Sequence, residues 1–291
     1  MQRPSFLCAL KINFLLSAGL LALLLAGSGC NRSQNNSPGR AQYDLGQRYY
    51  EGRGIPKDYA QAMHWYRRAA AAGNPEAQYS IAVMHQQGLG VTQNVAEAVQ
   101  WFRQAAAQNL VEAQVALGVC YFEGEGVEAD DAEALKWFQK AAAEENASGE
   151  FYVGLCHYRG AGVPRDVEQA VSWFTKSAEH GDPNAQSNLG VIYTKEPGRT
   201  NLTNAIAWFR RAGEKGQKEA EYRLGCFYQK GEGVPKDLVE AFKWLSLAVS
   251  HEHLFAKRAL AEVRSQMTAD QIVAGEKALA KAEENQKSGV E

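Results

Sequence analysis

The sequence predicts an all-α protein, a right-handed α-solenoid of six helix–turn–helix repeats followed by C-terminal capping helices. The main observation is the spacing of the tryptophans, which are separated by 36, 36, 36, 35 and 36 residues. They are Trp65, Trp101, Trp137, Trp173, Trp208 and Trp244. A fixed period of this size is typical of a solenoid, in which each unit buries its apolar face against its neighbours.

The second observation is that the first half of each unit has the pattern of an amphipathic helix that ends in glycine. In the third unit, Ala113, Leu117 and Cys120 recur at the spacing that places side chains on one stripe of a helix. Gly124 and Gly126 follow this stripe. Glycine adopts the left-handed conformation that ends a helix without a Cβ penalty, so a turn is expected there.

The third observation is a recurring N-cap for a second helix. Asp130 precedes Glu133 by three residues, so its carboxylate can accept a backbone N–H of the first turn while Glu133 reaches back. The same pairing recurs at Asp58–Gln61, Asn94–Glu97, Asp166–Gln169 and Asp237–Glu240. On this second helix, the rings of Trp137 and Phe138 are expected to fill the space between units.

This pattern resembles the Sel-one-like repeat family, solenoid relatives of the tetratricopeptide repeats. The residues that carry the resemblance in the third unit are Ala113, Leu117, Gly118, Tyr121, Gly124, Gly126, Val127, Asp130, Ala134, Trp137, Phe138, Lys140, Ala141 and Ala142. Six such units cover residues 41–255, and residues 256–291 are expected to form capping helices and a tail. The resemblance implies a binding scaffold without catalytic activity.

The N-terminus reads as an export signal of bacterial type at residues 1–29. Arg3 and Lys11 accompany an apolar run from Ile12 to Ala26, and Cys30 follows small residues. Such an end resembles a lipoprotein signal, in which Cys30 would be acylated, although Gly27 stands where these signals usually carry leucine. Cleavage with secretion, or an uncleaved anchor, are the alternatives. Residues 30–40 lack apolar content and are expected to form a flexible tether.

Two units depart from the pattern. The fourth opens with Gly149 in place of alanine, whereas the fifth replaces its first loop glycine by Glu196 and is one residue short. A local irregularity is therefore expected in the fifth unit, although Asn201 can still cap its second helix. After the sixth unit, Thr268 and Gln271 have the spacing of a cap for a last helix.

Composition and motifs argue against several functions. A net charge of −2 gives no sign of a nucleic-acid-binding surface. No catalytic motif and no cofactor site is predicted. No metal site is predicted either, because His251 and His253 do not share a helix face and lack a third ligand. Cys120, Cys156 and Cys226 are expected to be small buried residues, with disulfide formation left open.

The leading functional hypothesis is therefore a scaffold that binds a peptide or a partner protein. In the tetratricopeptide relatives the first helix of each unit lines a concave groove, and the resemblance places there the residues offset from the buried stripe. The candidate partner-binding residues are Tyr43, Tyr50, Tyr79, Phe122, Phe151, Tyr158, Arg159, Lys195, Tyr222 and Lys230. Packing of these rings between helices is the alternative, and the late basic residues would favour an acidic partner.

Two rival functions come from other classes. A cysteine-rich branch of the family has been linked to β-lactam binding and hydrolysis, but its paired cysteines within one unit do not occur here. A carbohydrate or peptidoglycan-fragment binder is the second rival, because exposed tyrosine suits the faces of sugars. Under each hypothesis the protein is exported, either as a membrane-anchored lipoprotein of the cell envelope or as a soluble periplasmic or secreted protein.

The lipid anchor can be tested directly. If Cys30 is acylated, Cys30→Ser should move the protein from the membrane fraction to the soluble envelope fraction, because one acyl-bearing residue supplies the attachment. Fractionation followed by intact-mass analysis measures this. A wild-type protein that is already soluble, or that retains residues 1–29, would contradict the lipoprotein hypothesis.

Overall fold

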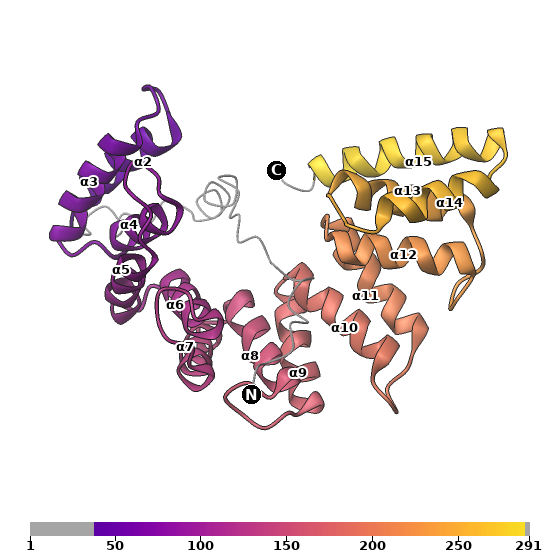
Figure 1. Cartoon of the computed structure of the whole chain (residues 1–291), viewed down its shortest axis with the longest axis horizontal. Coiled ribbons are helices and arrows are strands. Elements are labelled where there is room, and N and C mark those ends of the chain that lie inside the picture. The colour runs from indigo at the N-terminus through magenta and orange to yellow at the C-terminus, as the bar shows by residue number, and fades with distance from the viewer. Residues whose placement is uncertain (1–37, 289–291) are drawn as a thin grey trace.

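A computed structural model of the protein describes residues 38–288, and every regular element in this range is an α-helix. The helices follow one another along an open arc, with α2 at one end and α15 at the other (Figure 1). Each repeat contributes a pair of packed helices, which we call helix A and helix B. The predicted all-α solenoid is confirmed.

The helices have nearly uniform lengths. The A helices are α2 (Arg40–Glu51), α4 (Pro75–Gln87), α6 (Val111–Glu123), α8 (Ala147–Arg159), α10 (Pro183–Lys195) and α12 (Lys218–Lys230). The B helices are α3 (Tyr59–Ala71), α5 (Val95–Ala107), α7 (Asp131–Ala143), α9 (Val167–Glu179), α11 (Leu202–Glu214) and α13 (Leu238–Ser250). The chain continues through α14 (Ala256–Gln266) and α15 (Ala269–Ser288). The predicted signal peptide, Cys30 and tether residues 30–37 lie outside the described residues.

The predicted caps of the B helices are confirmed. Asp130 Oδ1 accepts the backbone N–H of Glu133 at 2.9 Å, and the caps of the other five B helices bind in the same way. Glu133 does not reach back as expected, because its carboxylate binds Lys136 at 2.9 Å. The structure adds caps on four A helices that the sequence analysis missed. These caps are Asn74, Asn146, Asp182 and Gln217.

A glycine inside helix A allows close packing against a ring in four of the six pairs, whereas α4 has Ala82 at this position and Gly225 of α12 meets Leu245. A Cβ added at Gly118 would lie 2.5 Å from Cε1 of Phe138, so the ring of helix B lies directly against the backbone of helix A. Gly46, Gly154 and Gly190 meet the ring of their own repeat in the same way. The resulting contact buries Phe138 completely.

A second glycine allows neighbouring repeats to approach each other. Gly126 has a φ of +72°, and a Cβ there would lie 2.5 Å from the carbonyl oxygen of Val95 in the preceding repeat. A side chain at this position would therefore meet both backbone strain and a collision with the start of the preceding helix B. The loop glycines thus serve the stacking of repeats as well as the turn.

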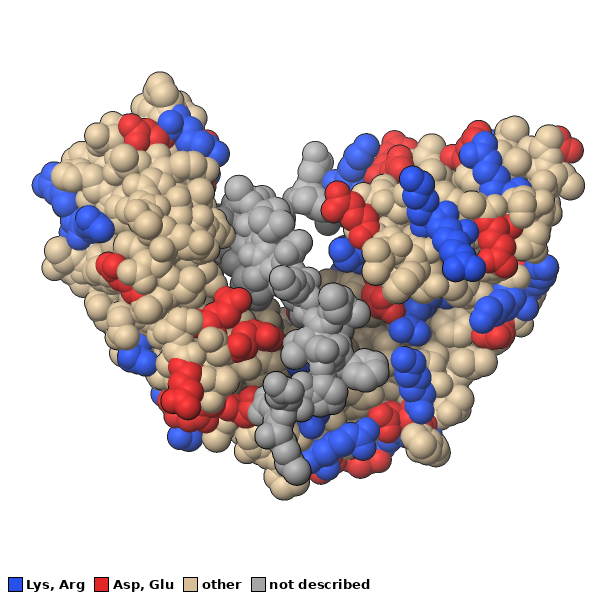
Figure 2. Space-filling view, in the orientation of Figure 1, with Lys and Arg blue, Asp and Glu red and all other residues tan. Residues whose placement is uncertain are grey.

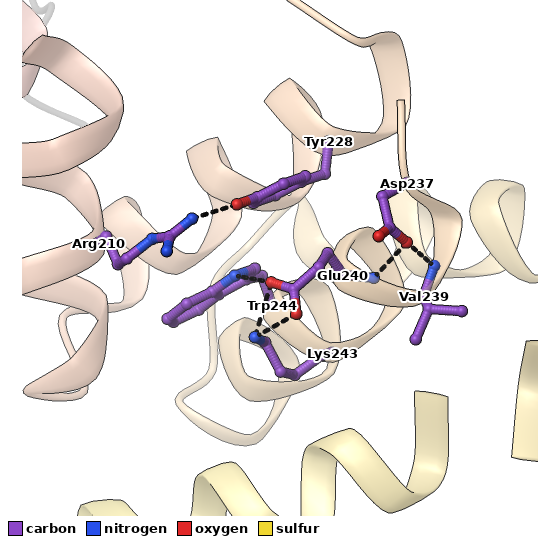
Figure 3. Close-up of polar contacts among 7 residues, drawn as sticks. All are labelled: Arg210, Tyr228, Asp237, Val239, Glu240, Lys243 and Trp244. Carbon is purple, nitrogen blue, oxygen red and sulfur yellow. Dashed lines mark hydrogen bonds and ion pairs between the residues drawn. The ribbon is translucent and has the colours of Figure 1, made fainter. Parts of the chain in front are cut away.

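The expectation that the tryptophans fill the core needs correction. Trp137 is only half-buried, whereas the neighbouring Phe138 is completely buried. Trp244 is the exception at 4% exposure, because Gly213 of the preceding repeat leaves room: a Cβ there would lie 2.9 Å from the indole. Figure 3 shows its indole N–H directed at Glu240, which accepts it at 3.1 Å.

Side chains also bind one repeat to the next. Arg103 of helix B donates to the hydroxyl of Tyr121 in the following helix A at 2.9 Å. Arg210 and Tyr228 make the equivalent contact between the fifth and sixth repeats (Figure 3). These bonds satisfy hydroxyl groups at the edge of the inter-repeat core, so the junction combines apolar packing with polar contacts.

The irregularity expected in the fifth repeat is confined to its loop. Glu196 ends α10 in an extended conformation, where other repeats have a left-handed glycine. Its carboxylate accepts the hydroxyl of Tyr158 at 3.0 Å and pairs with Arg165 at 2.8 Å. Arg199 of the same loop pairs with Glu168. The shortened loop is thus bound to the preceding repeat by two ion pairs.

Both ends of the stack carry polar residues. Arg48 is exposed in α2 at a position where Met84 and Cys120 of later repeats are buried. At the other end, Thr268 and Gln271 form the predicted reciprocal cap of α15. Polar outer faces of this kind keep the ends of a solenoid soluble. Between residues 38 and 288 no helix combines the length and the apolar character needed to cross a membrane.

The difference between the two neighbouring rings is testable. Phe138→Ala should lower the free energy of unfolding by about 3–5 kcal/mol, because it leaves a cavity between the paired helices. Trp137→Ala should cost only about 1–2 kcal/mol, because part of the indole is already in contact with water. Denaturant unfolding followed by circular dichroism measures both, and equal losses would contradict this account of the core.

Candidate interaction surface on the A helices

The A helices present a strip of side chains, partly exposed in most repeats but buried at Phe151, Tyr152 and Leu155 of α8, which we call the A-helix face. We number each A helix so that Pro75 of α4 is position 1; the face then consists of positions 2, 5, 6, 9, 12 and 13, opposite the buried stripe. Side chains of successive A helices meet along it, since the rings of Phe122 and Tyr152 lie 6.4 Å apart. This strip carries all of the partner-binding residues that the sequence predicts within the repeats.

The rings at position 5 mostly belong to the packing of their own repeat. Tyr43 and Phe151 are 8% and 5% exposed, and their rings lie 5.7 Å from Tyr66 and Phe174 of the paired helix B. The expectation that these two residues offer open contact area is therefore corrected, because position 5 borders the buried stripe. Whether any residue of the strip binds a partner stays a prediction.

Tyr79 and Tyr222, also at position 5, retain partial exposure. Tyr79 packs 5.5 Å from Phe102, and its burial raises the pKa of its hydroxyl. Tyr222 has no ring of helix B beneath it and instead stacks on His253 at 4.3 Å. The two tyrosines therefore border the face without belonging wholly to the core.

The rings at position 12, near the C-terminal end of each A helix, are half-buried. Tyr50 contacts Tyr59 edge-on at 5.4 Å. Phe122 lies beneath the guanidinium of Arg159 at 5.5 Å, and the ring of Tyr158 is held by its hydrogen bond to Glu196. Neighbouring side chains hold these rings in fixed orientations while part of each ring stays exposed, which are properties of side chains that anchor a partner.

The charge along position 13 changes sign from the N-terminal to the C-terminal repeats. Glu51 and Glu123 occupy it early, whereas Arg159, Lys195 and Lys230 occupy it late and are exposed. Within residues 38–288, Arg159 and Lys195 make no ion pair, and Lys230 lies 3.8 Å from Glu232. Figure 2 likewise shows most Lys and Arg of the visible side over the C-terminal half of the arc.

The sequence analysis missed a set of buried polar residues at position 4. These are Gln78, Gln114, Glu150, Gln186 and Glu221. Gln78 accepts a hydrogen bond at 2.8 Å from Gln108, which follows it by 30 residues at the end of the paired helix B. The signal in the sequence is a pair of polar residues at this separation, which recurs at Glu150–His180 and Glu221–His251.

In two repeats this pair is glutamate with histidine. His180 Nδ1 lies 2.7 Å from Glu150, and His251 Nδ1 lies 2.8 Å from Glu221. Glu221 is completely buried, and its carboxylate raises the pKa of His251. The buried carboxylate of Glu221 thus binds an imidazole, where the second repeat pairs two neutral amides, Gln78 and Gln108.

The cysteines and histidines have structural positions. Cys120, Cys156 and Cys226 are free, and each is the single cysteine of its repeat. Burial raises the pKa of the Cys120 thiol to about 12. His251 and His253 bind different carboxylates, Glu221 and Glu219. No group of three or more His, Cys, Asp or Glu side chains within residues 38–288 could hold a metal ion.

Comparison with known proteins identifies the repeat. The family model for the Sel1 repeat matches residues 39–74, 75–110, 111–146, 147–182, 183–217 and 218–253. The chain belongs to the Sel1 repeat family. The predicted six units and their period are thereby confirmed, with boundaries two residues earlier than expected. No match was found among curated proteins.

Solved structures of Sel1 repeat proteins resemble most of the chain. A Sel1 repeat protein from Oxalobacter formigenes is 34% identical with a TM-score of 0.70, over 82% of this chain and 98% of that chain. A protective antigen of uropathogenic Escherichia coli is 31% identical with a TM-score of 0.70, over 90% of this chain. The chain spans 58% of that antigen's length. An immunity protein of Pseudomonas aeruginosa, 15% identical with a TM-score of 0.52 over 77% of this chain and 88% of that chain, shares the fold.

Membership of the family indicates a general role. Sel1 repeats generally mediate contacts between proteins, and Sel1 repeat proteins are generally scaffolds without catalytic activity. A scaffold of this kind agrees with the structure of the A-helix face, where half-buried rings and exposed cations lie on rigid helices.

The pair formed by the buried Glu221 and the partly exposed His251 predicts a dependence of stability on pH. Because the folded-state pKa of His251 is raised, its stabilising effect is complete below the unfolded pKa, about 6.5, and is lost as pH rises through the folded pKa. The melting temperature of the wild type should therefore fall over this window relative to a Glu221→Gln/His251→Gln variant, which copies the Gln78–Gln108 pair. If the melting temperatures of the two proteins change in parallel between pH 6 and pH 9, the prediction is contradicted.

Proposed function

We propose that this Sel1 repeat protein is a non-enzymatic scaffold of the bacterial cell envelope that binds a peptide segment or a partner protein on its A-helix face. The observation that carries the proposal is the row of half-buried rings at position 12, including Phe122 and Tyr158, beside the exposed cations Arg159 and Lys195. Rings and arginine are the residues that dominate binding energy at protein interfaces.

The distribution of charge suggests how a partner would lie. An acidic segment would be attracted to the late repeats, where Arg159 and Lys195 are exposed and unpaired among the described residues. The early repeats carry Glu51 and Glu123 and would repel it. Charge complementarity of this kind sets orientation and association rate, and it weakens as salt is added.

The cell-envelope part of the proposal rests on the N-terminal sequence. The apolar run from Ile12 to Ala26, followed by Cys30, supports export and attachment through a lipid on Cys30. A solenoid joined to a membrane by a short polar segment would hold its A-helix face close to the surface, where envelope partners are found.

No second function is proposed. A β-lactam-binding or hydrolysing function would draw on paired cysteines within one unit, and the described cysteines are free and single in their repeats. A carbohydrate or peptidoglycan-fragment function would draw on open tyrosine faces. Tyr43 is buried, and the ring of Tyr158 lies under the guanidinium of Arg165.

Charge reversal on the A-helix face tests the proposal. Arg159→Glu combined with Lys195→Glu should lower recovery of native partners from the envelope by about tenfold, because two desolvated cation contacts would be replaced by repulsion. The measurement is affinity capture of the full-length protein from its own envelope, with the partners quantified by mass spectrometry. Thermal unfolding should be almost unchanged, because both side chains are exposed.

The matched control reverses two exposed cations away from this face. Arg67 lies on α3 and Lys277 on α15, and neither makes an ion pair within residues 38–288. Arg67→Glu with Lys277→Glu should leave capture at the wild-type level. Equal loss in both double variants would show a nonspecific effect of net charge, and no loss in either would exclude the A-helix face as the binding surface.

A further inference from the structure

The turn between α13 and α14 displays two large apolar side chains to solvent. Leu254 is 80% exposed and Phe255 is 59% exposed. Among the described residues, the only other large hydrophobic side chain with comparable exposure is Val273, on α15. A pair of adjacent exposed apolar residues costs solubility, so their position in the repeat is informative.

The repeat register places this turn at the end of the A-helix face. Ala256 is completely buried like the alanine at position 3 of the earlier A helices, and Val263 is completely buried at position 10. The helix α14 is therefore the A helix of an incomplete seventh unit, with Phe255 at position 2. Earlier repeats carry polar residues there, namely Arg40, Glu76, Glu112, Ser148, Asn184 and Glu219.

An aromatic row joins Phe255 to the sixth repeat. The ring of His253 stacks on Tyr222 at 4.3 Å with an interplanar angle of 17°, and Phe255 meets His253 edge-on at 6.1 Å. Tyr222 is one of the predicted partner-binding residues, so the row extends the A-helix face beyond the six repeats. Together with Leu254, these three residues form what we call the C-terminal aromatic corner.

Hydrogen bonds hold the aromatic corner in place. His253 Nδ1 accepts the backbone N–H of Phe255 at 3.3 Å, and His253 Nε2 lies 3.0 Å from Glu219. Glu219 in turn pairs with Arg223 at 2.6 Å. The apolar side chains are therefore displayed on a turn whose conformation is fixed, which lowers the entropy cost of binding.

The charges around the corner are mostly positive. Lys257 and Arg258 follow Phe255 directly, and Lys218 begins α12; all three are exposed and make no ion pair within residues 38–288. Arg258 occupies position 5 of α14, one helical turn beyond Phe255 and on the same face. The exposed Glu252 is the single acidic residue in this turn.

We propose that the C-terminal aromatic corner binds an acidic segment of a partner protein through one apolar anchor, an aromatic or aliphatic side chain. The anchor packs on Tyr222, Leu254 and Phe255, which the buried side chain of His253 supports, and flanking carboxylates pair with Lys257 and Arg258. This inference rests on the proposed scaffold function and names where the partner's anchor lies. The alignment of the rings with the A-helix face favours an extended protein segment over a lipid surface or a second copy of the chain.

Selection with displayed peptides tests the inference. A phage-displayed library of short random peptides is selected on the wild-type protein, and the enriched peptides are synthesised and titrated by fluorescence anisotropy. We expect them to combine Asp or Glu with one aromatic or aliphatic anchor. Leu254→Ser with Phe255→Ser should weaken their binding by about tenfold or more, as expected for loss of a hot spot. Lys257→Glu with Arg258→Glu should also weaken peptide binding, and the loss relative to the wild type should grow as the salt concentration is lowered, because charges are then screened less.

Matched controls separate this inference from its alternatives. Val273→Ser removes an equally exposed apolar side chain from α15 and should leave peptide binding unchanged. Enriched peptides that bind the Leu254→Ser/Phe255→Ser variant as tightly as the wild type overturn the inference. The inference is also overturned if no peptide binds and the wild type instead forms concentration-dependent dimers in sedimentation, or binds vesicles of anionic lipid, in a way that the same variant abolishes.

The two proposals can fail separately. If Arg159→Glu/Lys195→Glu weakens partner capture while Leu254→Ser/Phe255→Ser does not, the scaffold function stands and the aromatic corner is excluded. If neither double variant weakens capture, the A-helix face itself is excluded and the inference falls with it. Both double variants change exposed residues, so circular dichroism should show the wild-type helix content in each.

Discussion

The close contact between helix A and helix B, made in four of the six repeats by a glycine against a ring, is the constraint on which the rest of the structure depends. Gly118 has no side chain, so the ring of Phe138 lies on the backbone of α6 and becomes completely buried. The two helices then approach closely enough to form one rigid pair. The side chain of Trp137, one residue earlier, points away from this contact. It packs at the edge between repeats and is half-buried.

Departures from the repeat pattern are matched by contacts with a neighbouring repeat. Gly213 stands where the first four repeats have alanine, and the space it leaves is filled by the indole of Trp244. Glu196 replaces a loop glycine, and its carboxylate binds Tyr158 and Arg165 of the preceding repeat. Because each repeat touches only its neighbours, such a substitution is compensated locally and leaves the helices of the stack unchanged.

The surface of the solenoid follows from the same geometry. From α4 to α10, positions 3, 4, 7, 8 and 10 of helix A are buried, whereas positions 2, 12 and 13 lie outside the core and carry different residues in different repeats. The face begins with Glu51, turns basic at Arg159 and ends in the exposed Leu254 and Phe255. A regular scaffold thus presents an irregular strip, which is the property that a selective binding surface requires.

The sequence by itself determined the elements of this protein, because the period of 36 residues, the cap at Asp130 and the loop glycines are local or periodic signals. It did not determine which aromatic rings are exposed to solvent. Tyr43 and Tyr222 occupy the same position, yet Tyr43 is buried against Tyr66 while Tyr222 stacks on His253 at the border of the face. The buried polar pairs and the exposure of Phe255 were likewise decided by tertiary structure. Their physical cause is packing between residues that lie more than 20 positions apart in the chain, which no local pattern of apolar residues specifies.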